Sequence, residues 1–254
     1  MKFTILGSGT STGVPMVGCS CQACTSSDPF DKRTRSSLLI QHQDRNILID
    51  TSPDLRAQAL REKLQHIDAV LFTHSHADHV NGIDDMRGFH FLHKQVIPCF
   101  ASAQTLEILQ KAFFYIFDNN GNVAYPPIMK PNLLDGPLDL FGLNIIPIPL
   151  AHGNLISLGY RIGPLAYLTD CNAIPESSLE LLQGVDILII DGLRWNPHPF
   201  HFNIESAIVA ARPIKARRTI LTHLSHDVLY ADGQGKLPPG FEFAYDGMMF
   251  EYGD

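Results

Sequence analysis

The sequence predicts a layered α/β protein in which helices cover β-sheets, and two observations lead to this fold class. Short apolar runs rich in Val, Ile and Leu recur along the 254-residue chain, and each ends in a turn or polar residue, as strands do. Stretches with helical periodicity lie between these runs in both halves of the chain. Strands followed by helices pack as sheets with the helices outside, so we expect this arrangement in each half.

The apolar runs have the length of strands. The run at 37–51 holds two of them, because it turns between Gln43 and Asn46 and is typical of a hairpin. The other runs predict one strand each, at residues 3–9, 68–74, 95–101, 143–152, 165–170, 185–191 and 218–223.

Four stretches predict helices whose apolar faces pack in the core. In the first, 52–64, we expect Ser52 to be the N-cap and Pro53 the first helical residue. The stretch 102–117 repeats apolar residues at helical spacing. The third, 175–184, closes on Gly184, and the fourth, 203–214, ends at Pro213.

Composition limits the classes of function. With 45% hydrophobic residues the chain buries a substantial core, and a net charge of −7 without a basic run argues against a nucleic-acid clamp. The N-terminus has too few apolar residues for a signal peptide, and no apolar run approaches the length of a membrane span. We therefore expect a cytoplasmic protein with no membrane partner.

Three of the five cysteines, Cys19, Cys21 and Cys24, fall within "CSCQAC". Cytoplasmic thiols stay reduced, so the C-x-C-x-x-C spacing favours a metal site over disulfides, with free buried cysteines as the alternative. A tetrahedral zinc needs a fourth ligand, and His226 in "THLSH" supplies it. We expect a structural zinc ion, whereas Cys99 and Cys171 are expected to pack in the core.

A second cluster follows the expected strand at 68–74, where "THSHADH" places His74, His76, Asp78 and His79 within six positions. Core packing needs no such grouping, and the imidazoles would repel one another when charged. The spacing therefore predicts a metal site.

This H-x-H-x-D-H pattern resembles the metallo-β-lactamase superfamily. Further runs end as the superfamily requires, in "IPLAH" at His152, "AYLTD" at Asp170 and "TILTH" at His223. The resemblance implies a four-layer αββα sandwich, a single hydrolase domain over residues 1–254 whose two pseudo-equivalent halves join near 124–137.

The resemblance also implies a dinuclear centre. The first metal would be held by His74, His76 and His152, the second by Asp78, His79 and His223, with Asp170 bridging them. Asp50, which ends "NILID", would orient a ligand by a hydrogen bond. The nitrogen and carboxylate ligands suit two divalent ions, and zinc and manganese both stay open.

Within the superfamily the chain is similar to the PhnP family of phosphodiesterases, through "GSGTSTGVPMVGCSCQAC", "THSHADHVNG" and "PPGFEFAYDGMMFE". This similarity implies hydrolysis of a small cyclic or diester phosphate, of the phosphoribosyl 1,2-cyclic phosphate type, by a hydroxide that bridges the metals. Catalysis would depend on Asp78 and on His201 as general acid, with His198 as a nearby rival. Aromatic residues around His201 depart from the family pattern, so the substrate pocket is expected to differ.

Other functions stay open. A ribonuclease Z-like RNA endonuclease would share the metal ligands, but no basic insertion that could grasp tRNA stands out. A lactonase or thioesterase of the same superfamily would use the same centre. A non-catalytic metal-binding regulatory module is the alternative from another class, although all seven ligand positions are filled. A homodimer is also possible, since "FHFLHKQVI" suits either an interface or the core.

Overall fold

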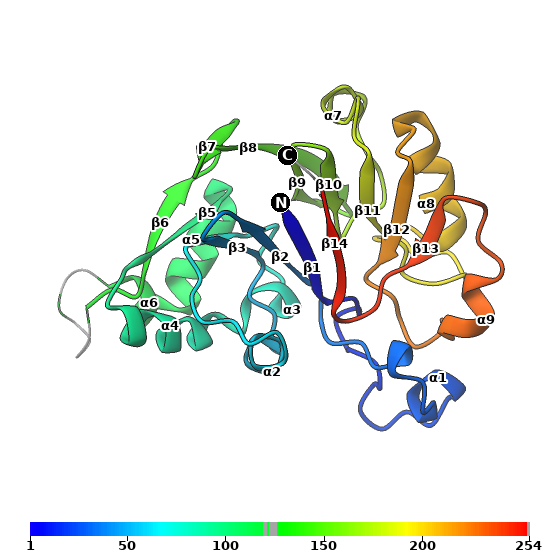
Figure 1. Ribbon diagram of the computed structural model, residues 1–254, viewed down its shortest axis with the longest axis horizontal. Coiled ribbons are helices and arrows are strands. Elements are labelled where there is room, and N and C mark those ends of the chain that lie inside the picture. The colour runs from blue at the N-terminus through cyan, green and yellow to red at the C-terminus, as the bar shows by residue number, and fades with distance from the viewer. Residues whose placement is uncertain (119–120, 122–125, 253–254) are drawn as a thin grey trace. The chain divides into compact units, whose positions relative to one another are not determined.

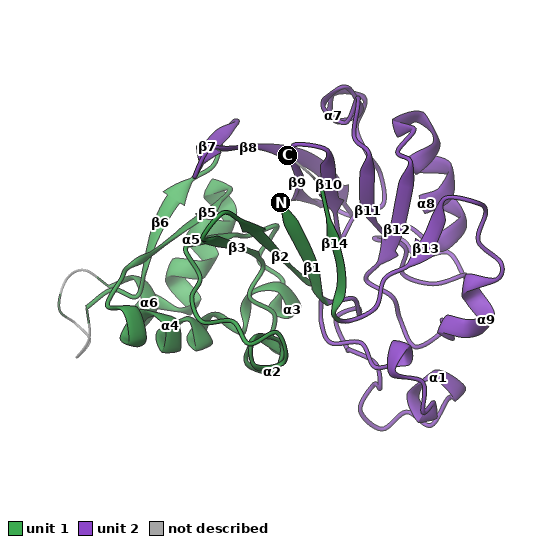
Figure 2. Cartoon of the chain, viewed as in Figure 1, with its two compact units in different colours: residues 1–6, 37–135, 247–254 green, residues 7–36, 136–246 purple. Residues whose placement is uncertain are grey.

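The computed structural model describes residues 1–118, 121 and 126–252. The chain divides into two compact units, coloured separately in Figure 2. Unit 1 consists of Met1–Leu6, Ser37–Asp135 and Gly247–Asp254, and unit 2 of Gly7–Ser36 and Gly136–Asp246. Each unit is thus assembled from separate stretches of the chain, and the N-terminal loop with the cysteines belongs to unit 2.

Unit 1 contains a seven-stranded mixed sheet. Its strands run in the order β14 (Met248–Glu251), β1 (Lys2–Gly7), β2 (Ser37–His42), β3 (Arg45–Ile49), β4 (Ala69–Leu71), β5 (Ile97–Ala101) and β6 (Met129–Leu133). β3 to β6 pair in parallel, whereas β2 and β3 form an antiparallel hairpin. The hairpin is confirmed: His42 pairs with Arg45, and Gln43 takes the positive φ of 51° that the tight turn needs.

The helices of unit 1 lie together against one face of its sheet (Figure 1). They are α2 (Leu55–Arg61), α3 (Ala77–Val80), α4 (Met86–His93), α5 (Ala103–Ala112) and α6 (Phe114–Phe117). Their buried apolar residues join those of alternate strand positions in one cluster, which includes Leu55, Met86, Leu109, Leu48 and Val70. The period of two along each strand selects which side chains meet the helices.

Two predicted helices differ from the structure. The first begins at Leu55 rather than Pro53, so Ser52 as N-cap is wrong; Asp54 holds that position. Ser52 Oγ instead accepts the Asp54 N–H at 3.2 Å and donates to Gln58 Oε1 at 3.1 Å, which closes a turn before the helix. The helix at 102–117 is divided at Phe113, whose φ of −122° and ψ of 42° are not helical.

Unit 2 contains a second seven-stranded mixed sheet. Its order is β13 (Phe241–Phe243), β12 (Arg218–Thr222), β11 (Ile187–Asp191), β10 (Leu165–Leu168), β9 (Leu155–Ile162), β8 (Leu143–His152) and β7 (Leu138–Leu140). β10 to β13 pair in parallel and β7 to β10 antiparallel. The carboxyl ends of β10, β11 and β12 therefore lie at one edge of this sheet.

The helices of unit 2 are α1 (Gln22–Thr25), α7 (Glu176–Leu181), α8 (Ile204–Ala211) and α9 (Tyr230–Gln234). The helix predicted at 203–214 is confirmed as α8, and Asn203 caps it by accepting the Ser206 N–H at 3.1 Å. Ile204, Ala207 and Ala211 of α8 pack with buried residues of β8, β10, β11 and β12. This packing fixes the segment between β11 and α8, which carries His201.

The junction expected near 124–137 begins at residues 124 and 125, which lie outside the described residues. From 126 onwards the chain is described, and Met129–Leu133 forms β6 of unit 1. In the described part of the chain, no helix has both the length and the apolar character that crossing a membrane requires.

Candidate metal centres and catalytic residues

The histidine cluster of unit 1 follows β4. His76 precedes the short helix α3, which carries Asp78 and His79 in its single turn. The His74 ring centroid lies 4.5 Å from that of His76 and 4.3 Å from that of His79, and His79 Nε2 lies 3.2 Å from Asp78 Oδ2. The structure thus brings together the four residues that the sequence singled out. Rings this close repel one another when protonated, so the group suits a bound cation.

Asp50, directly after β3, orients this cluster. It is fully buried and accepts three hydrogen bonds, from Thr73 N–H and Thr73 Oγ1 at 2.8 Å and from His79 Nδ1 at 2.7 Å. Burial raises the pKa of the Asp50 carboxyl, and the contact with His79 opposes that rise. The hydrogen bond from His79 Nδ1 to Asp50 fixes the orientation of the His79 ring, with Nε2 on the side away from Asp50. Orienting a ligand by a hydrogen bond is the role expected for Asp50.

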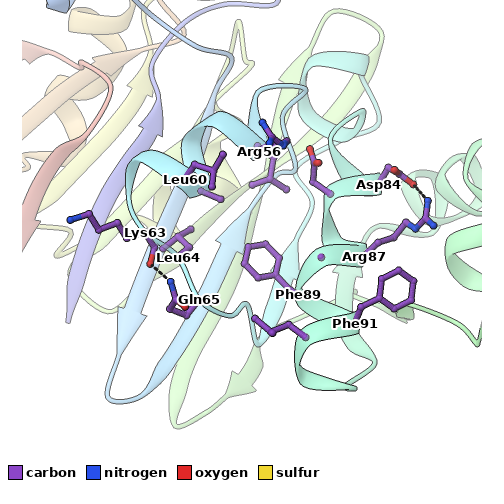
Figure 3. Close-up of a pocket in the computed structure, with 14 residues that line it drawn as sticks. Arg56, Leu60, Lys63, Leu64, Gln65, Asp84, Arg87, Phe89 and Phe91 are labelled. Atoms are coloured by element: carbon purple, nitrogen blue, oxygen red, sulfur yellow. Dashed lines mark hydrogen bonds and ion pairs between the residues drawn. The ribbon is translucent and has the colours of Figure 1, made fainter.

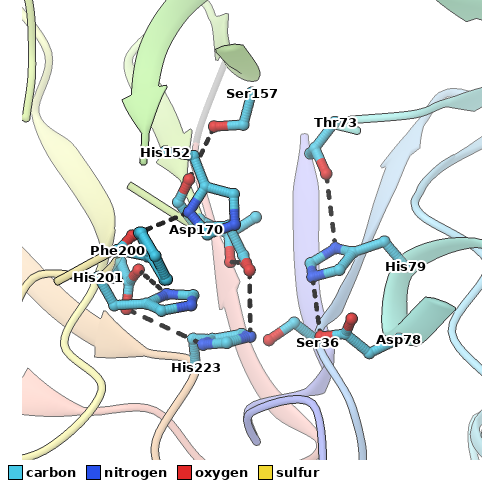
Figure 4. A network of polar contacts seen from close by, with 12 residues as sticks. Ser36, Thr73, Asp78, His79, His152, Ser157, Asp170, Phe200, His201 and His223 are labelled. Atoms are coloured by element: carbon cyan, nitrogen blue, oxygen red, sulfur yellow. Dashed lines mark hydrogen bonds and ion pairs between the residues drawn. The ribbon is translucent and has the colours of Figure 1, made fainter. Parts of the chain in front are cut away.

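Three further predicted ligands lie at strand ends in unit 2 (Figure 4). His152 ends β8, Asp170 follows β10, and His223 directly follows β12; all three are buried. Asp170 Oδ2 lies 3.4 Å from His223 Nε2. His152 Nδ1 donates to the carbonyl oxygen of Phe200 at 2.8 Å, which fixes the orientation of the ring and of its Nε2.

His201 forms a dyad with Asp191, a residue that the sequence analysis missed. Asp191 ends β11 and is fully buried; its Oδ2 accepts from His201 Nδ1 at 2.7 Å and from the Cys171 N–H at 3.0 Å. The His201 ring stacks on that of His223, with centroids 4.8 Å apart and planes inclined by 12°. With Nδ1 fixed by a carboxylate, Nε2 of His201 is oriented for proton transfer.

His198, the rival, has weaker support. Its Nδ1 accepts the Phe200 N–H at 3.3 Å, its ring lies 5.1 Å from that of His201, and burial lowers its pKa. No hydrogen bond to a carboxylate is recorded for it among the described residues. A carboxylate therefore orients the His201 ring, whereas only a backbone N–H contacts the His198 ring.

The thiol cluster of unit 2 is also assembled. His226 Nδ1 lies 3.3 Å from Cys19 Sγ and 3.4 Å from Cys21 Sγ, and the ligand atoms of these residues and Cys24 all lie within 4.8 Å of one another. Tetrahedral zinc, with bonds of about 2.0–2.3 Å, holds such atoms about 3.5–3.8 Å apart, so the residues fit the ion. The Cys24 backbone N–H and the His226 side chain lower the pKa of Cys21 to about 6, which favours the thiolate that zinc binds.

The loop beside the thiols is fixed by a buried arginine. Arg33 donates to the carbonyl oxygens of Ser225 at 3.1 Å and Val228 at 2.9 Å and forms an ion pair with Asp31 at 2.9 Å. The N-terminal loop is thus tied to the segment that carries His223 and His226. Asp246 accepts hydrogen bonds from the Ser8 N–H and the Thr34 N–H, which joins the same loop to the segment after β13.

Unit 1 also has a groove of about 630 Å³, which Figure 3 shows between α2 and α4. Apolar side chains such as Leu60, Phe89 and Phe91 line it, together with Arg56 and Lys63. None of the predicted metal or catalytic residues lines this groove. The chemistry-bearing side chains gather at the strand ends instead.

Comparison with known proteins identifies the family and the fold of the chain. Residues 45–224 match the family model described as a β-lactamase superfamily domain. A solved structure described as a new diphosphatase from the PhnP family is 40% identical and superposes with a TM-score of 0.92, covering 99% of this chain and 98% of that one. The predicted α/β fold class of the metallo-β-lactamase type is thereby confirmed.

Two other relatives differ more from this chain, one because it is about twice as long and the other because its sequence identity is low. An octanoyltransferase from Porphyromonas gingivalis is 41% identical over 98% of this chain, but the chain spans only 51% of that relative. The short form of human tRNase Z superposes with a TM-score of 0.72 at 18% identity, over 99% of each chain, and shares the fold.

Proposed function

The chain belongs to the metallo-β-lactamase superfamily of hydrolases, and we propose that it cleaves a phosphorus–oxygen bond in a small cyclic or diester phosphate. The proposal includes phosphoribosyl cyclic phosphates and substituted diphosphates, because in both the attacked phosphorus carries two ester or anhydride oxygens. The relative described as a PhnP-family diphosphatase, 40% identical, supports this substrate class.

The observation that carries the proposal is the Asp191–His201 dyad stacked on the ligand His223. Attack on such a phosphorus expels an alkoxide or phosphate oxygen, and an alkoxide leaves poorly without a proton. His201 Nε2 would donate that proton while Asp191 keeps Nδ1–H in place. A thiolate leaves readily without protonation, so the dyad favours an oxygen ester over a thioester.

We propose that seven histidines and aspartates of the chain hold two divalent ions, zinc or manganese. The first ion would be held by His74, His76 and His152, the second by Asp78, His79 and His223, with Asp170 between them. Bound ions would supply positive charge to the phosphoryl oxygens and lower the pKa of a water molecule. The geometry of His79 and His152 supports these roles. In each ring Nδ1 makes a hydrogen bond, which fixes the direction of Nε2.

A third ion, a structural zinc, is proposed at Cys19, Cys21, Cys24 and His226. Since His226 lies three residues after His223, the zinc would position the segment that carries this active-site ligand.

The activities of two relatives do not extend to this chain. The chain spans about half of the octanoyltransferase, so the octanoyltransferase activity is not proposed for this chain. The tRNase Z neighbour shares the fold at 18% identity, and the net charge of −7 favours a small substrate over RNA.

The test compares leaving groups in protein reconstituted with zinc or manganese. Wild type, Asp78→Ala and His201→Ala are assayed on bis(p-nitrophenyl) phosphate and on a nucleoside cyclic phosphate. Asp78→Ala should abolish both activities. His201→Ala should lose about 100-fold in kcat on the cyclic phosphate and much less on the nitrophenyl ester, whose leaving group departs unprotonated. Faster turnover of a lactone or an RNA hairpin than of any small phosphate would overturn the proposal.

A further inference from the structure

We propose that Phe200 is a stacking surface for a planar ring, such as a nucleobase, carried by the substrate's leaving group. The inference rests on the proposed function and narrows the substrate class to nucleotides. It starts from an aromatic side chain that the structure leaves half exposed beside the His201 acid and the ligand His152 (Figure 4).

The residue Phe200 is 49% exposed, and its ring packs against the backbone at Gly153. A Cβ at Gly153 would lie 2.5 Å from Phe200 Cδ1, so a glycine at 153 is what lets the ring lie there. Gly153 directly follows the ligand His152, and Phe200 directly precedes His201. Phe200 is therefore next to His201 in the sequence, and its ring contacts the residue that follows His152.

The backbone around Phe200 is held by hydrogen bonds. The Phe200 carbonyl accepts from His152 Nδ1 at 2.8 Å, the Pro199 carbonyl accepts from Asn172 Nδ2 at 2.9 Å, and the Phe202 N–H donates to the Cys171 carbonyl at 2.7 Å. A ring on such a fixed segment loses little conformational freedom when a ligand stacks on it. This distinguishes Phe200 from the scattered exposed apolar side chains of most proteins.

A second ring lies beside the first. The His198 centroid is 5.9 Å from that of Phe200 and 5.1 Å from that of His201, so aromatic rings flank the acid. Because His201 protonates the leaving oxygen in the proposed function, the group attached to that oxygen is the part of the substrate nearest these rings. A flat, uncharged, polarisable group fits them, and a nucleobase has these properties.

Binding tests the inference without turnover. Calorimetry would measure the Kd of adenosine monophosphate and of ribose 5-phosphate, which lacks the base, for metal-loaded wild type, Phe200→Leu and Phe200→Tyr. Phe200→Leu should weaken adenosine monophosphate about tenfold and ribose 5-phosphate less than about twofold, whereas Phe200→Tyr should keep wild-type values. Phe91→Leu, which alters a comparably exposed Phe on α4, is the matched control and should change neither.

Turnover of diadenosine diphosphate and its base-free analogue provides the second readout. Phe200→Leu should lower kcat/KM selectively for the substrate with bases. If it weakens both ligands equally, or neither, Phe200 has only a structural role and the inference is wrong. If wild type hydrolyses no phosphate but the base-dependent loss of adenosine monophosphate binding persists, the proposed function fails while the ring contact stands.

Discussion

Replacing Asp50 by Asn should weaken metal binding through His79, although Asp50 is not itself expected to touch a metal. The carboxylate accepts three hydrogen bonds of 2.7–2.8 Å in a position with no exposed surface. An Asn side chain offers one oxygen acceptor and an NH₂ donor. In one orientation the NH₂ group would face Thr73 Oγ1 and His79 Nδ1, which both donate to Oδ2; in the other it would face the Thr73 N–H, which donates to Oδ1.

The magnitude follows from these contacts. His79 can meet an NH₂ group only by moving its proton from Nδ1 to Nε2, which blocks the nitrogen expected to bind metal. Loss of such a supporting contact costs about 10–100-fold in metal affinity. If His79 keeps its proton, one buried donor loses its acceptor, which lowers the free energy of unfolding by about 1–3 kcal/mol.

The assay is metal competition against a chelator of known affinity, together with chemical denaturation of the metal-free protein. Asp68→Asn is the matched control, because Asp68 also accepts a backbone N–H, from Asn46 at 2.8 Å, but at the opposite end of β3. The control should lose stability and keep its metal affinity. Asp50→Asn protein with wild-type affinity for both of the proposed ions would refute the reasoning.

Three further outcomes are expected. Cys24→Ala should lower the zinc content by about one ion per chain and lower the Tm, whereas Cys99→Ala, a core thiol, should keep the zinc; elemental analysis and thermal melts decide. Asp191→Asn should reduce kcat about 100-fold on a nucleoside cyclic phosphate and little on bis(p-nitrophenyl) phosphate, and an equal loss on both would contradict the dyad. Gly153→Ala should displace the Phe200 ring, since its Cβ would lie 2.5 Å from Cδ1 and φ is +60°, and should lower the affinity for adenosine monophosphate; unchanged affinity would count against the contact.

The sequence predicted the strands that lie in the longest apolar runs, such as Leu143–His152 and Ile187–Asp191, because such runs leave few alternatives. It missed β6, β7, β9, β13 and β14. Of these, β7 and β13 are edge strands of three residues each, which carry no clear period, whereas β9 has eight residues, and Ser157, Gly159 and Arg161 interrupt its apolar pattern. It also missed α4, whose sequence "MRGFHFLH" contains a glycine and mixes polar with aromatic residues.

For the candidate site, spacing identified the residues of compact clusters and strand ends, but it could not identify Asp191. An aspartate at the end of an apolar strand is common, and only the return of the chain ten residues later brings His201 to it. The signal was nevertheless present, because "DILIID" ends as "NILID" does at Asp50. A second strand-end aspartate of that kind is a reason to search for a histidine that it could orient.

Three site residues share a backbone conformation that explains why strand ends carry this chemistry. Asp50, Asp170 and His223 have φ values of 62°, 52° and 60°, in the left-handed region that most residues avoid. Each follows a buried strand, so the left-handed residue turns the chain sharply where hydrogen bonding in the sheet ends. Glycine would adopt this turn with less strain, but it has no carboxylate or imidazole. The chain therefore accepts backbone strain of about 1 kcal/mol or more at each position, which is understandable if the side chains are needed for function rather than for folding.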